Sequence, residues 1–537
     1  MRKITAIFLA FLMLAVVFLF AASCGEAKTP ESTATTTNVN AATSSTAENT
    51  AKSSDGGNDQ TETTNGGGTS LITEPTDTTS ADKPIDDLEN WDGRTKLPGK
   101  ENIDFGGKTF LFASAEDTDT GWANADEIWV ESLTNDAIND AVFERNQIIG
   151  KLYNCTIAVD DGGWANGFDA DVASGGGKYI AACNEYLTTA KAFHSGNFYN
   201  VLNLDIDFTK SWWDQAYFRD LECNGKLYSL CGDFAYHQMK ATWLMFYNKN
   251  VYEQNFPDTD IYQLVRDKQW TLDKLIEMSQ QATKDNDGDT NITFSEGDHA
   301  DIIGATSHPH NYRGLYFACG EFFVSHDENG KMVCAIESSG RGSDVIDKIR
   351  ELTTSDFYVE MGYTNVRKAM ENNTALFAFE CMGAIQLMAD VEGLRLGIIP
   401  MPLYNEEQSQ YYHYVNNRGS EYGIPITYKN MQEAADFFTL FAAHSQKIVR
   451  SIYIDTFKYT YASDEESGEM LDLIFDTRTY DPGYHMELGT SMDSTLSSML
   501  AKGGRNQFTS AVKKYSANIN NNIEDLETKL AAIKDPV

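Results

Sequence analysis

Apolar positions recur with two different periods over the first part of the chain's globular region. Residues 109–113 and 155–159 are short apolar runs, as expected of strands buried in a sheet. Between them, 135–152 carries apolar residues at helical spacing. The pattern further predicts a helix over 179–193 and a strand over 198–206. Strands that alternate with helices indicate an α/β fold with a largely parallel sheet.

The pattern then becomes richer in aromatic residues and in helices. Asn224-Gly225 is a hairpin signal, and 242–247 reads as an aromatic strand. Thr271 is a natural N-cap for a helix that extends to about residue 283. Further helical patterns follow over 343–353, 431–444 and 463–476, and from 491 to the end.

The first residues have the pattern of an export signal. Arg2 and Lys3 precede the unbroken apolar run 7–20. This run is short for a spanning helix of about 20 residues, although flanking alanines bring an uncleaved membrane anchor within reach. Residues 20–25 resemble a bacterial lipobox, with Ala21 where leucine is usual. The resemblance implies a signal peptide over 1–23 and a lipidated Cys24. With either interpretation we expect the rest of the chain to lie outside the cytoplasm.

A polar segment separates Cys24 from the globular region. Residues 24–83 are rich in Thr, Ser, Asn and Gly and contain almost no large apolar residue, so they cannot bury enough surface to offset the entropy of ordering. We expect a disordered tether. The remainder, 84–537, has ordinary globular composition and is long enough for two domains.

The charge of the chain excludes some partners. Its formal net charge is −37, which argues against nucleic acid as a partner and against direct adhesion to an anionic membrane surface. Of the eight cysteines, seven remain if Cys24 carries lipid, so they cannot all pair within one chain. Two pairs, Cys223 with Cys231 and Cys319 with Cys334, flank hairpin signals. Each pair is either a cross-strand disulfide or two free buried thiols.

The order of several short motifs resembles that of a known family, the extracellular solute-binding proteins of ABC transporters, which include maltose-binding protein. Each motif is weak alone, but their order and spacing match over 87–537. The residues that carry the resemblance are 139–146 with 153–154, 212–214 with 225–228, 246–249 before 270–274, and 399–402 with 423–425.

The resemblance implies a two-lobed, type II periplasmic-binding-protein-like fold with a ligand cleft between the lobes and crossing strands as the hinge. The solute-binding domain would be 84–537, with a first lobe of about 100–242 and 412–462 and a second of about 243–411 and 463–537. It further implies a monomeric, lipid-anchored protein on the extracellular face of the cell membrane. Such a protein captures a mono- or oligosaccharide and delivers it to the permease of an importer.

Two other functions stay open. One is a binding protein for a non-sugar ligand such as a peptide, and the other is a secreted glycoside hydrolase acting through two carboxylates. The chain shows no phosphate-binding loop and no serine-hydrolase or zinc-protease motif. We therefore expect no enzyme activity and no catalytic residue.

Sugar sites pair aromatic faces with convergent hydrogen-bonding groups, so the tryptophans are the first candidates for ligand contact. Trp122 follows the first strand, and ligands gather at the carboxyl ends of strands in α/β sheets. Trp213 belongs to an adjacent tryptophan pair, and Trp243 begins the aromatic strand. All eight tryptophans lie at or before Trp270, which favours a stacking platform on one lobe. For each of the three, a place in the core is the alternative.

Four polar or aromatic residues complete the predicted ligand site. The resemblance places Tyr236 and Glu380 where relatives often meet ligand or carry a cleft-facing polar group. Asn416 and Arg418 follow an aromatic strand near the second crossing. The guanidinium of Arg418 can bind two hydroxyls or a carboxylate, with a surface ion pair as its alternative.

One acidic loop has the spacing of a calcium site. Its oxygen-bearing residues follow the EF-hand pattern, with Thr290 in the sixth position, where a glycine is usual. Calcium would be structural here, the alternative is an acidic surface turn, and no other cofactor is required. The predicted ligands are Asp285, Asp287, Asp289, Asn291 and Glu296.

Overall fold

A computed structural model describes residues 88–115, 125–186, 189, 192, 195–388, 391–461 and 464–534, except for the side chains of 460 and 461. The chain divides into two units, 1–81 and 82–537, and the second contains all the elements described below. The predicted signal peptide, Cys24, the whole of the predicted tether and Trp122 lie outside the described residues.

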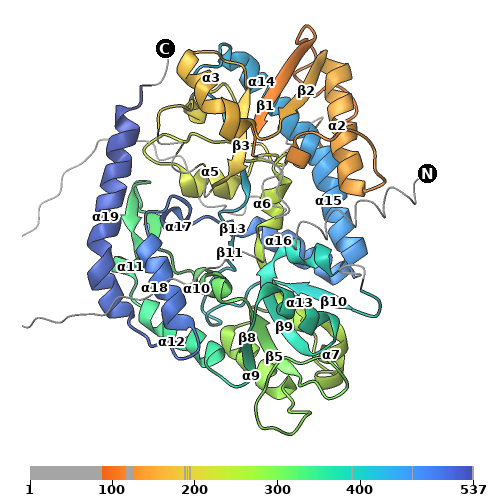
Figure 1. Ribbon diagram of the computed structural model, residues 1–537, viewed down its shortest axis with the longest axis vertical. Helices are drawn as coiled ribbons and strands as arrows, with labels where there is room; N and C mark the ends of the chain where they lie inside the picture. The colour runs from red at the N-terminus through yellow and green to blue at the C-terminus, as the bar shows by residue number, and fades with distance from the viewer. Residues whose placement is uncertain are drawn as a thin grey trace, which may run out of the picture. The chain divides into compact units, whose positions relative to one another are not determined.

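The first sheet has four strands in the order β12-β3-β1-β2. β1 (Lys108–Ser114) lies parallel to both β2 (Cys155–Asp160) and β3 (Ala181–Glu185), whereas β12 (Ser420–Gly423) is antiparallel to β3. We call this sheet and the helices packed on it the first lobe; it occupies the upper part of Figure 1. The prediction of parallel strands alternating with helices is confirmed for β1 and β2.

The helices of the first lobe come from two distant parts of the chain. α2 (Ala137–Tyr153) starts where the Asp136 carboxylate accepts the N–H groups of Ile138 and Asn139. α14 (Met431–Ser445), the π-helical turn η6 (Gln446–Arg450) and α15 (Ser451–Asp455) return to pack against it, and a second π-helical turn, η7 (Thr456–Tyr461), follows α15. The shorter elements are η1 (Ala125–Glu127), η2 (Trp164–Phe168), α3 (Asp169–Ser174), η3 (Val201–Asn203), α5 (Gln215–Leu221) and α6 (Tyr236–Lys240).

Aromatic rings form the centre of the first lobe. Phe110 and Phe112 of β1 meet Phe437 and Phe441 of α14, and the ring centroids of Phe110 and Phe437 are 4.1 Å apart. Such tightly packed rings contribute more than their buried area alone. This packing joins the 431–445 helix to the first sheet although some 300 residues separate them in the sequence.

Two predicted elements of this lobe were wrong. The helix expected over 179–193 begins instead as the strand β3, in which Ala181, Ala182, Cys183 and Asn184 are all buried. A strand buried on both faces shows no alternation, so its apolar run cannot be told from a buried helix by pattern. The strand expected over 198–206 is an isolated bridge at Phe198 followed by the single turn η3.

The second sheet has five strands in the order β10-β4-β9-β5-β8. β4 (Trp243–Asn248) is antiparallel to β10 (Leu396–Ile399) and β9 (Ala375–Cys381), and β5 (Ile303–Ser307) is parallel to β9 and β8 (Tyr358–Glu360). We call this sheet and its helices the second lobe. Its other elements are α7 (Lys249–Asn255), α8 (Ile261–Arg266), α9 (Leu272–Ala282), η4 (Pro309–Asn311), α10 (Tyr312–Ala318), β6 (Val324–His326), β7 (Met332–Cys334), α11 (Ala335–Ser338), α12 (Gly342–Thr353), α13 (Tyr363–Glu371), η5 (Met382–Leu387), α16 (Glu465–Asp476), α17 (Pro482–His485), α18 (Thr490–Leu500) and α19 (Phe508–Ala532).

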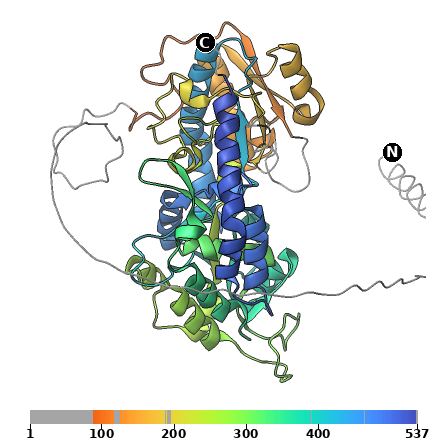
Figure 2. The same cartoon turned by 90° about the vertical axis from the view of Figure 1, so that its left-hand side faces the viewer.

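The last helix reaches both lobes. α19 packs on α18, α12 and β7 of the second lobe, and Figure 2 shows it extending toward the first. There the Lys226 ammonium donates to the carbonyl oxygens of Leu530 (2.7 Å) and Ile533 (2.9 Å). Both carbonyls lie at the end of α19, where the regular helical acceptor pattern stops, and that of Leu530 also accepts the Ile533 N–H at 3.3 Å. A lysine of the first lobe thus caps a helix of the second.

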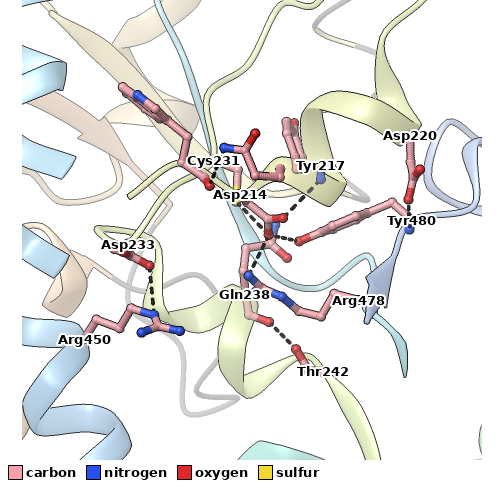
Figure 3. A network of polar contacts seen from close by, with 12 residues as sticks. Asp214, Tyr217, Asp220, Cys231, Asp233, Gln238, Thr242, Arg450, Arg478 and Tyr480 are labelled. Carbon is pink, nitrogen blue, oxygen red and sulfur yellow. Dashed lines mark hydrogen bonds and ion pairs between the residues drawn. The ribbon is translucent and has the colours of Figure 1, made fainter. Parts of the chain in front are cut away.

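The connections between the lobes are held by a buried polar network, drawn in Figure 3. β11 (His413–Tyr414) pairs in parallel with β13 (Arg478–Thr479). The carboxylate of Asp214, in the first lobe, accepts a hydrogen bond from the Tyr480 hydroxyl (2.6 Å) and pairs with the Arg478 guanidinium (3.2 Å). The segment containing β13 is thereby fastened to the first lobe. The lobe boundaries given above remain predictions.

All seven cysteines among the described residues are free thiols with buried side chains. Of the two alternatives for the pairs Cys223–Cys231 and Cys319–Cys334, the structure shows free buried thiols and no disulfide. Within the same part of the chain, no helix combines the length and the apolar character needed to cross a membrane.

Candidate functional site

A cavity of about 960 Å³ lies where the segments that cross between the lobes, around residues 240–243 and 416–418, meet the second lobe. We call these the crossing segments. This volume is in the upper part of the range typical of small-molecule sites. Its walls come from the end of α6, the start of β4, the end of β9 with η5, the segment 416–418, and parts of η4, α10, α13, α17 and α18. The helical walls thus belong to elements far apart in the sequence.

Trp243 forms one aromatic wall of the cavity. It opens β4 and pairs across the sheet with Cys381, the last residue of β9. Its ring packs against Gly314 of α10, where an added Cβ would lie only 3.2 Å from an indole carbon. The side chain is 2% exposed, and its Nε1–H has no hydrogen-bond partner among the described residues. The indole of Trp243 fits here because Gly314 has no side chain.

Glu380 lies beside Trp243 at the end of the neighbouring strand. It is 6% exposed and lines the cavity, and its Oε1 accepts the Cys381 N–H at 3.1 Å. Burial raises the pKa of this carboxyl to about 7. Near neutral pH the group therefore exists both as a hydrogen-bond-donating acid and as an acceptor carboxylate.

A chain of four polar side chains runs along a second wall. The Arg313 guanidinium binds both carboxylate oxygens of Asp493, at 2.8 and 2.9 Å, and donates to the Tyr484 hydroxyl at 3.0 Å. The Tyr484 hydroxyl donates in turn to Oδ1 of Asn417 at 2.9 Å. The guanidinium carbon also lies 4.7 Å from the centre of the Tyr484 ring. Two-point binding by the carboxylate holds this chain in one geometry.

Three further cations line the cavity. Arg418 pairs with Glu185 at 3.0 Å, as the surface-ion-pair alternative predicts, and its side chain is 45% exposed. The Lys240 ammonium lies 4.9 Å from the centre of the Tyr236 ring; burial lowers the pKa of Lys240, against the opposing influence of Asp126. Arg367 makes no hydrogen bond and no ion pair with any described residue.

Four of the predicted ligand residues meet in this cavity, namely Trp243, Glu380, Asn416 and Arg418. Trp213 does not: it is 2% exposed and packs against Phe208, Phe218 and Phe234 in the first lobe. Tyr236 is buried beneath Lys240, and its hydroxyl donates to Asp126 at 2.8 Å. Contact between any of these residues and a ligand stays a prediction.

Other lining residues escaped the sequence analysis. The described aromatic walls besides Trp243 are Tyr363, Tyr484 and His310, all from the second lobe rather than from a tryptophan platform on the first. Arg313 and Arg367 lie on α10 and α13, whose patterns reveal only which face is buried. No local signal distinguishes a cavity-facing arginine on a helix from a solvated one.

The acidic loop brings three of its five predicted ligands together. Carboxylate oxygens of Asp285, Asp287 and Asp289 lie within 4.8 Å of one another on exposed side chains. Asp285 also accepts the N–H of Thr290 at 2.9 Å, and Thr290 adopts φ 72°, the left-handed conformation that favours glycine. Glu296 instead pairs with Lys368 at 2.7 Å. Asn291 contacts Asp289 only through hydrogen bonds within the loop. Calcium binding stays a prediction.

No protein-family model and no curated protein sequence matches the chain. Solved structures do. The cyclic α-maltosyl-1,6-maltose binding protein from Arthrobacter globiformis is 11% identical, with a TM-score of 0.51 over 78% of this chain and 99% of that one. The galacto-N-biose/lacto-N-biose I-binding protein of an ABC transporter from Bifidobacterium longum, in complex with lacto-N-biose, is 15% identical, with a TM-score of 0.51 over 79% and 98%. The chain therefore has the two-lobed, periplasmic-binding-protein-like α/β fold of these two structures.

Proposed function

We propose that this protein is the extracellular substrate-binding lipoprotein of an ABC importer, which captures a mono- or oligosaccharide and delivers it to the permease. The observation that carries the proposal is the cavity of about 960 Å³ beside the crossing segments, in a fold shared with two sugar-binding proteins. Capture and release require no bond to be made or broken, so no residue is assigned a catalytic role.

The lining of the cavity suits a sugar. Trp243, Tyr363 and Tyr484 offer aromatic faces to the apolar C–H surface of a pyranose ring. Asn416, Asn417 and Glu380 offer hydrogen-bonding groups for its hydroxyls. Aromatic surface together with a few convergent polar groups is the general composition of small-molecule sites.

The proposed location follows from the start of the chain. A lipid on Cys24 would anchor the protein to the outer face of the cell membrane, and the polar segment 24–83 would act as a tether. The membrane partner would be the permease that receives the sugar.

A thermal-shift screen tests this function. The chain without its export signal is heated with sugars, oligosaccharides, peptides and amino acids, and each sugar is then analysed for cleavage. A ligand at 100 times its Kd should stabilise the folded state by about 2.7 kcal/mol. We expect a shift with one glycan series, and we expect that glycan to be recovered intact. A shift with peptides alone would overturn the ligand class, and cleavage of the glycan would overturn the binding function.

Trp243→Ala should reduce the ligand-induced shift, measured against the variant's own ligand-free melting temperature. Trp129→Ala is the control, because Trp129 is 39% exposed and is not among the residues that line the cavity. Equal shifts in the two variants would exclude Trp243 from the site.

A further inference from the structure

Several hydrogen-bond donors of the cavity are left without a partner, whereas several of its side-chain acceptors are engaged by the protein. This imbalance follows from which polar atoms are already engaged by the protein. A ligand must satisfy whatever remains, because a polar group that is buried without a partner costs binding free energy.

The orientation of Asn417 is fixed by the residues behind it. An arginine can only donate hydrogen bonds, so the Tyr484 hydroxyl oxygen accepts from Arg313 and its hydrogen is directed to Asn417 Oδ1. The carbonyl end of this amide is therefore occupied. Asn417, a buried residue on the cavity wall, has its NH₂ group left for a ligand.

Several other acceptors on the wall are engaged as well. Both oxygens of Asp493 bind Arg313. Asn416 Oδ1 accepts the backbone N–H of Arg418 at 3.1 Å, and one oxygen of Glu380 accepts the Cys381 N–H. Asp493 and the Asn416 carbonyl are thus engaged within the protein, and Glu380 keeps one oxygen for a ligand.

The donors are largely uncommitted. Arg367 makes no hydrogen bond or ion pair with a described residue, although its charge acts on Glu380, and the Trp243 Nε1–H is buried without a partner among those residues. Lys240 faces the ring of Tyr236 and forms no ion pair with a described residue, although the charge of Asp126 acts on it. Arginine and protonated lysine are donor-only groups, and the guanidinium keeps its charge throughout the pH range of proteins. When a cleft closes on a ligand and excludes water, such cations need a counter-charge.

We propose that the ligand carries an anionic, acceptor-only group, the carboxylate of an acidic sugar, which Arg367 and Lys240 bind at the end of β9. The inference rests on the proposed sugar-binding function and names its substrate class. Lys240 lies beside η5, where its Cβ is 3.4 Å from the Cβ position at Gly383, and Arg367 acts electrostatically on Glu380, the penultimate residue of β9. The two cations thus flank the same strand end.

A neutral sugar fits this wall less well. Each hydroxyl brings a donor of its own that requires an acceptor, whereas a carboxylate brings none. A sulfated sugar presents similar acceptor chemistry. The geometry of a guanidinium fork matches a carboxylate in two-point binding, and the experiment below separates the two sources.

The test compares ligands that differ only in the charged group. Uronic acid oligosaccharides, their carboxyl-reduced neutral forms and sulfated oligosaccharides of equal length are titrated into the full secreted chain by calorimetry. We expect the uronate to bind about tenfold or more tightly than its reduced form, because hydrogen bonds to charged groups are the stronger ones. Preference for the sulfated series would assign the anion to sulfate and overturn the carboxylate.

Adjacent residues of α13 supply a matched pair of variants. Arg367→Gln should lower the affinity for the uronate about tenfold and leave the affinity for the reduced form almost unchanged. Lys368→Gln should change neither, because Lys368 pairs with Glu296 and is not among the residues that line the cavity. Lys240→Met gives a second, independent loss, and ligand-free melting temperatures check that each variant folds.

The two proposals fail in different ways. Equal binding of uronate and reduced sugar, or an unchanged preference in both Arg367→Gln and Lys240→Met, would overturn the acidic ligand while leaving sugar binding intact. Absence of binding to every acidic and neutral sugar, with binding of peptides, would overturn the proposed function itself.

Discussion

At the scale of single residues, Glu127 shows how burial controls titration in the first lobe. Its carboxylate is fully buried, accepts the backbone N–H of His237 at 3.0 Å and is hydrogen-bonded by the Tyr422 hydroxyl. Burial raises the pKa of Glu127 to about 7, above the value of about 4.3 for an exposed glutamate. Burial also lowers the pKa of His237 to about 3, so the imidazole stays neutral above pH 5.

The sign of the resulting pH dependence is fixed by the raised pKa. The folded state holds the Glu127 proton more tightly than the unfolded state. The contribution of this proton to the free energy of unfolding is therefore fully present below about pH 4 and is lost as pH rises through 7. Glu127→Gln cannot ionise. We expect the variant to gain on the order of 2 kcal/mol relative to the parent between pH 5 and pH 8, measured by urea denaturation at each pH.

Glu131→Gln, at an exposed position, is the control and should follow the parent at every pH. A constant difference between Glu127→Gln and the parent would show that Glu127 does not titrate in this range.

The tryptophans show what the sequence predicts about single residues and what it cannot. Trp213 and Trp243 are equally buried, at 2% exposure, yet one packs inside the first lobe and the other lines the cavity. Composition indicates that both are buried. Whether a buried tryptophan lies in the core or lines a cavity depends on its neighbours in the fold. Trp243 has the space left by Gly314 on one side and the cavity on the other.

At the scale of elements, the acidic loop after α9 carries the calcium prediction. Three aspartates converge there, and mutual repulsion of their charges disfavours the loop unless a cation binds. We expect calcium to raise the melting temperature by a few degrees, roughly the effect of a ligand present well above its Kd. Removal with EDTA should reverse the rise, and Asp287→Asn should abolish it.

Asp258→Asn, at an exposed acid outside the loop, should retain the response to calcium. If EDTA leaves the thermal stability unchanged and no metal co-purifies, the loop is only an acidic turn.

Elements with a clear period or a clear cap were predicted well. The Thr271 side chain caps α9 by accepting the Lys274 N–H, as expected, and the predicted helix over 135–152 is observed as α2. β3 was missed because its first four side chains are all buried, so apolar and polar residues do not alternate along it. The difference lies in the environment of each face and not in the propensity of the residues.

At the scale of the whole folded unit, the contact of Lys226 with the end of α19 links the two lobes. Charged hydrogen bonds of this kind are typically worth about 1.5–3 kcal/mol, and partial exposure reduces that. Lys226→Met should lower the free energy of unfolding by about 1 kcal/mol and increase amide hydrogen exchange over the last turn of α19. Chemical denaturation and exchange mass spectrometry measure the two effects.

Lys331→Met is the matched control, because Lys331 pairs with Glu527 of the same helix at 3.7 Å from a 56% exposed side chain. A long ion pair from an exposed lysine contributes little, so this variant should match the parent. Unchanged exchange at the end of α19 in Lys226→Met would show that the lysine does not hold it.

The cavity could not be assembled from the sequence even though the fold was expected. Its walls combine Trp243 and Glu380, which strand ends indicated, with Arg313, Arg367 and Tyr484 from three separate helices. Which helix faces bound a cavity depends on how α10, α13 and α17 pack in three dimensions. That information is distributed over many long-range contacts and leaves no local pattern.

The seven buried thiols have a practical consequence for optical sensing. A maleimide dye reacts with the thiolate, and burial raises the pKa of Cys183, Cys231 and Cys381 and removes them from the dye's reach. A single cysteine engineered at the rim of the cavity, for example in place of the 63% exposed Leu387, would then be labelled selectively over these native thiols. The resulting conjugate would report the binding of a ligand in the cavity as a change in fluorescence.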